Sequence, residues 1–431
     1  MPLTKPLRAQ GLPRLKARRM EICLTAAHAF VERGFDATSV NDIAAALGIT
    51  KAGLYHYISS KESLLFDIIT LGLDSIDEEV VEPTRAMADP EARFLDIVLR
   101  HALLATCNDG VITLLIDEVH ALPPAQRKKI NLRRRKYFEY VREALLELEA
   151  AGRLLDIDPT VAAFSVIGAI VWLPQWFRPG GRLSSEEVAE EMVPFIGNAV
   201  LRPASARRKI EPGSKKPPAA AAARRARRRL DGRAFPRLNP RRFEICMTAA
   251  RTFVERGYEA TSVNEVAAAV GVTKAGLYHY ISGKDALLLE IVTLGMDWLD
   301  EDVVKVVRTI PDAETRLRET IGRHARLTAC NEPWITALLD EMHGLPPADR
   351  RKIEERKRAY FDLVRRMIRE LQAAGRIRPV DATVATYAIL GMIIWIPRWF
   401  RPRRRLRADE VASDVAAIAL NALFTKRGGI G

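Results

Sequence analysis

Two identical ten-residue segments, at 50–59 and 273–282, hold the side chains in this chain that are best suited to chemistry. Each segment reads Thr-Lys-Ala-Gly-Leu-Tyr-His-Tyr-Ile-Ser, and combines a cation, a histidine and two phenolic hydroxyls with small residues. Lysine, tyrosine and histidine can donate hydrogen bonds to phosphate oxygens. Small residues after a threonine cap let the N-terminus of a helix approach phosphates and base edges closely. These segments therefore predict binding to a nucleic acid.

A second set of polar residues recurs with matching spacing further along each half. Its members are His101, Asp117, Glu118 and His120, and then His324, Asp340, Glu341 and His343. Histidine and carboxylate groups on one helix face can bind a metal, but nothing in either set supplies a fourth ligand. We therefore predict no metal and no cofactor. Hydrogen bonding to a bound small molecule and a purely structural role both stay open for these residues.

Each half also contains a tryptophan-rich motif that ends in arginine and proline. It runs from Trp172 to Pro179 in the first half and from Trp395 to Pro402 in the second. Arg178 and Arg401 within these motifs could meet an anionic ligand. A favourable charge at the C-terminus of a helix is the commoner role for such an arginine.

These motifs recur because one half of the chain maps onto the other at a constant offset of 223 residues. The match needs no gap from Glu21 to about Val200, and it pairs Cys107 with Cys330. A period this long indicates a duplicated domain, not a solenoid repeat. Each copy has roughly 180 to 190 residues, which is enough to bury a core of its own.

Positive charge is concentrated just before each copy. Residues 202–242 include fifteen lysines and arginines against Glu211 and Asp231, an excess that equals the net charge of +13 for the whole chain. Residues 1–19 add six basic side chains and no acidic one. Such segments attract a phosphate backbone whatever its base sequence, although a linker that only aids solubility is the alternative. We predict a basic N-terminal arm at 1–17 and a flexible basic linker at 203–240.

The cysteines and the apolar stretches indicate the cellular compartment in which the protein is expected. Cys23, Cys107, Cys246 and Cys330 lie in apolar helical patterns without metal-ligand spacing, which predicts buried free thiols in a reducing compartment. The N-terminus has no apolar signal core, and the longest apolar stretches, at 161–173 and 388–397, are short for a bilayer span. We expect a cytoplasmic, nucleoid-associated protein with no membrane partner.

Apolar residues recur at helical spacing in both halves without an alternating strand pattern, so the predicted fold class is all-α. In the first copy, an apolar stripe from Met20 to Phe30 is expected to end at Gly34. Thr38 or Ser39 then caps a short helix, Gly48 turns the chain, and Thr50 caps the next helix. Two short helices joined by a tight glycine turn form a helix-turn-helix. Breaks between later helices are predicted at Pro83, Pro90, Pro123-Pro124 and Gly152.

The spacing of Ala44, Gly48, the segment 50–57 and Lys61 closely resembles the DNA-binding domain of the TetR family of transcriptional regulators. The second copy repeats the pattern, and the match covers about 45 residues in each half. The resemblance implies operator DNA as a partner. The residues that it implies for DNA binding are Thr38, Thr50, Lys51, Gly53, Tyr55, His56 and Lys61, with Thr261, Thr273, Lys274, Gly276, Tyr278, His279 and Lys284. We expect Tyr55 on DNA and Tyr57 inside the domain.

The same resemblance implies the domain order. Helix-turn-helix domains of three helices are expected at 18–65 and 241–288, and helical ligand-binding and dimerisation domains at 66–202 and 289–425. The tryptophan-rich motif and the last helix are similar to members that sense fatty or steroid acyl-CoA thioesters. The implied inducer is an acyl-CoA or another hydrophobic carboxylic acid derivative. Candidate residues for binding it are His101, Glu118, Trp172, Arg178, His324, Glu341, Trp395 and Arg401.

Together these features predict a ligand-responsive repressor that reads an inverted-repeat operator with two identical recognition helices. The two copies are expected to pair within one chain as a pseudo-dimer, while a dimer of chains with four DNA-binding modules stays open. An enzyme is disfavoured, because the sequence has no nucleophile beside a base and no phosphate-cradling glycine loop. The remaining alternatives are an acyl-thioester-binding protein without a transcriptional role and a nonspecific DNA-coating protein.

Overall fold

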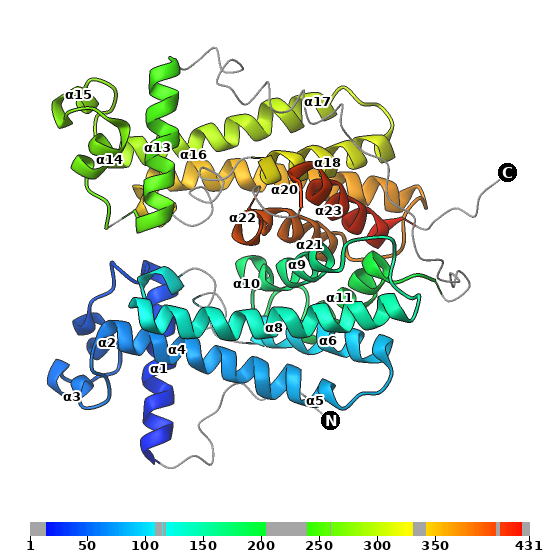
Figure 1. The fold of residues 1–431 in the computed structure, drawn as a ribbon, viewed down its shortest axis with the longest axis horizontal. Helices are drawn as coiled ribbons and strands as arrows, with labels where there is room; N and C mark the ends of the chain where they lie inside the picture. The colour runs from blue at the N-terminus through cyan, green and yellow to red at the C-terminus, as the bar shows by residue number, and fades with distance from the viewer. Residues whose placement is uncertain are drawn as a thin grey trace. The chain divides into compact units, whose positions relative to one another are not determined.

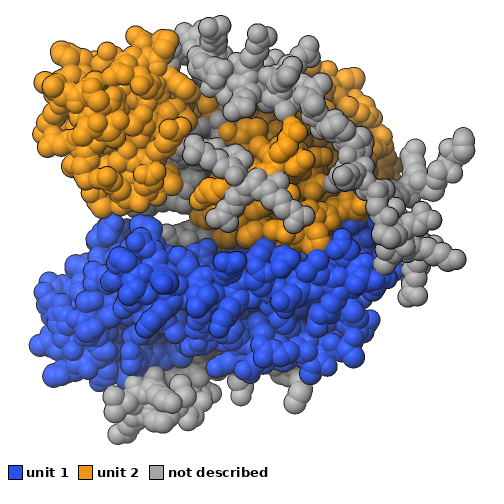
Figure 2. All heavy atoms as spheres, viewed as in Figure 1, with its two compact units in different colours: residues 1–155, 166–203 blue, residues 156–165, 204–431 orange. Residues whose placement is uncertain are grey.

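The computed structural model describes residues 14–107, 114, 118–203, 239–258, 260–330, 342–401 and 406–424. The chain divides into two compact units, residues 1–155 with 166–203 and residues 156–165 with 204–431 (Figure 2). In the described ranges the elements are helices, and extended pairing is limited to an isolated bridge between Leu154 and Leu201. The all-α prediction is confirmed. The basic arm and the basic linker lie almost wholly outside the described residues.

The first copy follows the helix order that its periodicity predicts (Figure 1). Its helices are α1 (Arg14–Arg33), α2 (Val40–Ala46), α3 (Lys51–Tyr55), α4 (Lys61–Ile76), η1 (Asp77–Val81), α5 (Glu82–Arg85), α6 (Pro90–Cys107), η2 (Val119–Ala121), α8 (Pro124–Ala150), α9 (Pro159–Val171), α10 (Leu173–Trp176) and α11 (Ser185–Val200). Ser184 and Glu187 form a capping box at the start of α11. Prolines open α6 and α8, because a missing N–H costs nothing in the first turn of a helix.

The second copy repeats this order closely. Its helices are α13 (Pro240–Arg256), α14 (Val263–Val270), α15 (Lys274–Tyr278), α16 (Lys284–Leu299), η4 (Asp300–Val304), α17 (Lys305–Val307), α18 (Ala313–Cys330), η5 (Met342–Gly344), α20 (Pro347–Ala373), α21 (Ala382–Ile394), α22 (Ile396–Trp399) and α23 (Ala408–Leu423). Helix α6 packs on α11 in the first copy, and α18 packs on α23 in the second. Both helices of the first pair carry fully buried side chains, such as Phe94 on α6 and Met192 on α11, and burial of each large apolar side chain contributes about 1.5–3 kcal/mol.

Pro83 does not break the chain, contrary to the prediction. Helix α4 continues through the π-helical turn η1 into α5, with Pro83 in the first turn of α5. The second copy has the same π turn, η4, and carries Val306 at the position of Pro83. The π turn is therefore a shared feature of this helix and not a consequence of the proline. Pro90, Pro124 and Gly152 do mark helix ends as predicted.

The domain boundaries expected at 65/66 and 288/289 fall inside helices α4 and α16. Helix α4 therefore belongs both to the three-helix domain and to the larger helical domain. An arginine fixes its far end: the guanidinium of Arg133 on α8 lies 2.7 Å from the Asp74 carboxylate and 2.5 Å from the Asp77 carboxylate. Arg356 makes the equivalent ion pairs in the second copy. The three-helix domain and Arg133 therefore contact opposite ends of one continuous helix.

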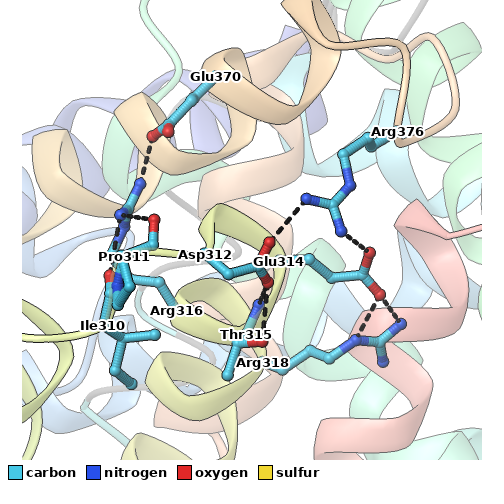
Figure 3. Close-up of polar contacts among 9 residues, drawn as sticks. All are labelled: Ile310, Pro311, Asp312, Glu314, Thr315, Arg316, Arg318, Glu370 and Arg376. Atoms are coloured by element: carbon cyan, nitrogen blue, oxygen red, sulfur yellow. Dashed lines mark hydrogen bonds and ion pairs between the residues drawn. The ribbon is translucent and has the colours of Figure 1, made fainter.

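Ion pairs also join the start of α18 to the end of α20 and the loop after it (Figure 3). Arg376 pairs with Asp312 at 2.9 Å and with Glu314 at 2.7 Å, and Arg318 shares the Glu314 carboxylate. The hydrogen bond from Arg376 holds the pKa of Asp312 well below its usual range. Because these groups are largely exposed, the network contributes little to stability. Arg153 and Glu91 repeat part of it in the first copy.

Two apolar windows, Pro159–Trp176 and Ala382–Trp399, are long enough to qualify as membrane spans by length and composition. This corrects the expectation that the apolar stretches are too short. However, 67% of the first window and 72% of the second are buried inside the protein. Such burial is typical of the central helices of a folded core.

Candidate nucleic-acid interface and polar core site

The entry to the helix-turn-helix is fixed by a capping box. The Ser39 hydroxyl accepts a hydrogen bond from the Asp42 N–H, and the Asp42 carboxylate accepts one from the Ser39 N–H at 2.8 Å. Ser39, not Thr38, is therefore the cap. Thr38 is fully buried and donates its hydroxyl to the Gly34 carbonyl at 2.8 Å. Thr261 is equally buried in the second copy, so these two threonines position the loop before the helix and offer no exposed group to DNA.

A glycine makes the turn between the two short helices. Gly48 and Gly271 adopt left-handed backbone conformations, with φ of 65° and 76°. A side chain would strain this backbone, although nothing lies within 4 Å of where a Cβ would be. The turn sets the angle at which the following helix leaves the domain.

The predicted recognition helices α3 and α15 have matching geometry. The Thr50 hydroxyl accepts the Gly53 N–H at 3.0 Å, and Thr273 accepts the Gly276 N–H at the same distance. A Cβ on Gly53 would lie 3.2 Å from the Thr50 hydroxyl oxygen, so a small residue suits this cap. The fully buried Leu54 packs the inner face of α3 against the rest of its domain. Identical sequences thus produce identical local structures.

The outward side chains of α3 and α15 form the candidate interface. Tyr55 and Tyr278 are each 46% exposed, which is unusual for large rings. The other exposed members are Lys51, His56, Lys274 and His279, with the capping residues Thr50 and Thr273. Tyr57 is half-buried, in line with its expected packing role. These residues place ammonium, imidazole and hydroxyl groups at the surface of one short helix and its caps in each copy.

Lys61 has its ammonium group inside its own domain. It donates to the carbonyl oxygens of Phe35 at 2.8 Å and Thr38 at 3.1 Å, and lies 4.2 Å from the centre of the Phe35 ring. Lys284 lies in the same way over the Tyr258 ring. These contacts support a role in positioning the loop before α2. A direct phosphate contact by Lys61 or Lys284 stays a prediction.

Glu118 does not lie among the ligand candidates in the core. Its carboxylate accepts the Phe35 N–H at 3.3 Å, so the segment that leads into η2 contacts the helix-turn-helix domain of its own copy. The second copy makes a related contact, because the Gly344 backbone packs against the Tyr258 ring. Glu341, the counterpart of Glu118, lies outside the described residues, as do Asp117 and Asp340.

The two predicted histidines of the larger domain form buried pairs with tyrosines. The Tyr137 hydroxyl lies 2.8 Å from His101 Nδ1, and the Tyr360 hydroxyl lies 3.1 Å from His324 Nδ1. Burial lowers the pKa of each histidine to about 4 and raises the pKa of both tyrosines. Both histidines are therefore neutral at physiological pH. The tyrosine partners were missed from sequence, although the same separation of 36 residues in both copies was a signal.

The arginines of the tryptophan-rich motif serve the helix ends. Arg178 donates to the Phe177 carbonyl at 2.9 Å, and Arg401 donates to the Phe400 and Pro397 carbonyls. This geometry supports the commoner of their two predicted roles. Trp172 and Trp395 are buried. Among the described residues, the buried Trp172 indole N–H has no hydrogen-bond partner.

Among the described residues no group of three or more histidine, cysteine or acidic side chains could hold a metal ion. Cys23 and Cys246 are buried free thiols as predicted, and burial raises the pKa of each to about 12, whereas Cys107 and Cys330 are free but only half-buried. The thiols of Cys23 and Cys246 are protonated and unreactive at neutral pH.

Comparison with known proteins agrees with the duplicated geometry. The profile of bacterial regulatory proteins of the tetR family matches residues 22–68 and 245–291, and the tetracyclin repressor-like C-terminal domain matches 87–200 and 311–423. The HTH-type transcriptional repressor KstR2 of Rhodococcus jostii is 28% identical over 191 residues, which are 43% of this chain and 92% of that protein. The activator FasR of Mycolicibacterium smegmatis is 36% identical over 90 residues, covering 21% of this chain and 41% of FasR.

Solved structures cover a single copy. The crystal structure of AibR in complex with isovaleryl coenzyme A and operator DNA is 37% identical, covers 41% of this chain and 96% of its own, and has a TM-score of 0.39. The structure of KstR2 of Mycobacterium tuberculosis is 24% identical, covers 46% and 100%, and has a TM-score of 0.42. The family profiles, in contrast, occur twice and together match more than half of the residues. The chain belongs to the TetR family of bacterial transcription regulators, and it carries two copies of the family's DNA-binding and C-terminal domains.

Proposed function

We propose that this protein is a ligand-responsive repressor in which two copies of the TetR unit pair within one chain and read an inverted-repeat operator. The observation that carries the proposal is the identity of α3 and α15. They share their sequence, their threonine caps and the 46% exposure of Tyr55 and Tyr278. Two identical recognition helices recognise the same base pattern, so the operator should contain two equal half-sites.

The half-sites should face each other about one helical turn apart, because paired helix-turn-helix modules present their recognition helices to successive major grooves. Pairing inside one chain is supported by the small and apolar residues of the helices that the family uses for dimerisation. In α9 these include Val161, Ala162, Gly168 and Ala169, and in α21 they include Ala385, Ala388 and Gly391. Small residues let helices pack closely. A dimer of chains would instead carry four recognition helices.

The proposed inducer is an acyl-CoA or another hydrophobic carboxylic acid derivative. The tryptophan-rich motif, which is similar to acyl-CoA-sensing members, suggests this class. The buried pairs of His101 with Tyr137 and of His324 with Tyr360, together with the Trp172 N–H, place polar groups in otherwise apolar helical domains. A ligand that binds there changes operator affinity only through its preference for one of two conformations. Helix α4, fixed at its far end by Arg133, is the proposed route to the DNA-binding domain.

Repression is proposed over activation because KstR2, a repressor, aligns over 92% of its length, whereas the activator FasR aligns over 41%. The protein would act in the cytoplasm, on the chromosome, without catalytic activity.

Binding-site selection tests this function. The full-length chain would be used to select duplexes from a random library, and the recovered sequences would be compared with scrambled controls at physiological salt. We expect an inverted repeat with equal halves, and release of the duplex by a panel of acyl-CoA thioesters but not by free coenzyme A. Recovery of no shared sequence would refute specific recognition. Recovery of an inverted repeat that no acyl-CoA releases would refute the inducer class alone.

A further inference from the structure

Helix α8 carries a stripe of basic residues near its N-terminus that no step of the proposed function uses. The basic stripe consists of Lys128, Lys129, Leu132, Arg135 and Lys136. Leu132 is three or four residues from each of the other four along α8, so the five side chains lie on one face. All five are exposed, and Leu132 at the centre is 58% exposed. The stripe is open to a partner over its whole length.

The protein itself hardly neutralises this charge. Residues 124–138 contain seven lysines and arginines and no acidic residue. Among the described residues, no carboxylate lies within ion-pair distance of Lys128, Lys129 or Lys136, and the Arg135 guanidinium reaches only Glu139, at 4.0 Å. Like charges on one helix face repel each other and lower the stability of the helix. An anionic partner would remove that repulsion.

The second copy shows that the fold does not require the stripe. At the equivalent positions α20 has Arg351, Lys352, Glu355, Arg358 and Ala359. Glu355 stands where Leu132 stands, and the Lys352 ammonium lies 2.9 Å from the Asp349 carboxylate. Residues 347–361 contain six basic and three acidic side chains, against seven and none in the first copy. The two copies match in helix length and cap, so their difference lies in surface charge.

The stripe begins close to the DNA-binding domain of its own copy. Helix α8 follows η2 directly, and Glu118 just before η2 accepts the Phe35 N–H. The Phe35 carbonyl in turn accepts the Lys61 ammonium, next to the start of the helix-turn-helix. In Figure 1, α8 begins on the side of its unit where α1 and α2 lie. Because the basic stripe begins close to the DNA-binding domain, DNA is the polyanion that it is best placed to bind.

We propose that the basic stripe binds the DNA backbone that flanks the half-site read by the first copy. The inference rests on the proposed function. From Lys128 to Lys136 the stripe extends about 12 Å, at 1.5 Å per residue. That length matches about three to four phosphates of one strand, and the side chains reach further. Two copies that read the same bases would therefore hold the backbone unequally, and their footprint on a symmetric operator would be asymmetric.

The salt dependence of binding tests the proposal. The slope of log affinity against log salt is negative, and each lost phosphate contact reduces its magnitude by about 0.9. The probe is the duplex selected above, with long flanks. The triple variant Lys128→Gln, Lys129→Gln, Lys136→Gln should lower the slope by about 2 to 3. The matched control is Arg351→Gln, Lys352→Gln, Arg358→Gln in the second copy, which should lower it by less than about 1. Unchanged melting temperatures establish that both variants fold.

The outcomes separate this inference from the function on which it rests. A wild-type chain that does not prefer the selected duplex to a scrambled one refutes specific recognition. A wild-type chain that does prefer it, with a triple variant of unchanged slope, overturns the basic stripe alone. In that case binding to vesicles of anionic lipid would identify a membrane surface as the partner in place of DNA. Equal losses in the triple variant and its control would overturn the asymmetry.

Discussion

The Tyr137 hydroxyl lies 2.8 Å from His101 Nδ1 inside the helical domain, and the Tyr360 hydroxyl and His324 repeat the contact in the second copy. Both groups of each pair are buried, and their rings meet edge to face. A hydrogen bond between neutral groups offsets the cost of burying both. The pairs therefore let an apolar core hold polar atoms without charge.

The first prediction concerns the pH dependence of stability. Burial lowers the folded-state pKa of His101 and His324 to about 4, below the unfolded value of about 6.5. Their contribution is complete above about pH 6.5 and is lost as the pH falls towards 4, because the unfolded chain then binds more protons. At pH 5 the loss should be about 2 kcal/mol per histidine. Melting temperatures from pH 7.5 to 5 should fall more steeply for wild type than for a His101→Gln, His324→Gln variant, and parallel curves would contradict this account.

The second prediction concerns the exposed tyrosines of the recognition helices. The double variant Tyr55→Ala, Tyr278→Ala should weaken operator binding at least about 100-fold, since each hydroxyl that binds a phosphate contributes about 1.5–3 kcal/mol. Melting should barely change, because both rings are 46% exposed. The matched control is Tyr57→Phe with Tyr280→Phe, which alters half-buried rings. Wild-type affinity in the Tyr55 and Tyr278 variant, measured by gel shift, would remove these residues from the interface.

The third prediction separates two roles for Lys61. Replacing it with methionine removes hydrogen bonds to the Phe35 and Thr38 carbonyls and should cost about 1–3 kcal/mol of stability. If Lys61 only positions the loop, the salt slope of operator binding stays at its wild-type value. A fall of about 1 in the slope would instead assign it a phosphate contact. Lys284→Met provides the same comparison in the second copy.

The fourth prediction concerns the contact between the two domains of the second copy. A Cβ on Gly344 would lie 2.5 Å from Cε1 of the Tyr258 ring, which is closer than real carbon contacts. Gly344→Ala should therefore destabilise the protein by about 1–3 kcal/mol through overpacking. The control is the reverse change in the first copy, Ala121→Gly, which introduces no clash. Equal melting temperatures for wild type and Gly344→Ala would contradict this prediction, because they would show that the Tyr258 ring moves aside without loss of stability.

Much of the fold could be predicted from sequence because local signals decided it. Gly34, Gly48 and Thr50 each stand where a backbone conformation or an unpaired N–H requires them. The helix break predicted at Pro83 was wrong, because the chain stays helical through a π turn just before the proline. Residue type alone does not indicate such a turn. The same limit explains the expected domain boundary inside α4, since a continuous amphipathic helix can serve two cores.

The candidate site was harder to predict, because side-chain partners come from distant parts of the chain. Tyr55 lies exposed as expected, since its neighbours Leu54 and Ile58 fill the core below it. Lys61 and Glu118 both bind backbone groups of the loop after α1, a contact between segments that spacing does not reveal. Tyr137, the partner of His101, stands 36 residues away on another helix.

Native mass spectrometry of the full-length chain, alone and with the selected duplex, tests the central claim most directly. Pairing of the two copies within one chain predicts a free species of 48.2 kDa and a complex of one chain per inverted-repeat duplex. Small molecules retained on the free chain would identify the inducer. A free species of doubled mass, with two chains on a longer duplex, would contradict the single-chain pseudo-dimer.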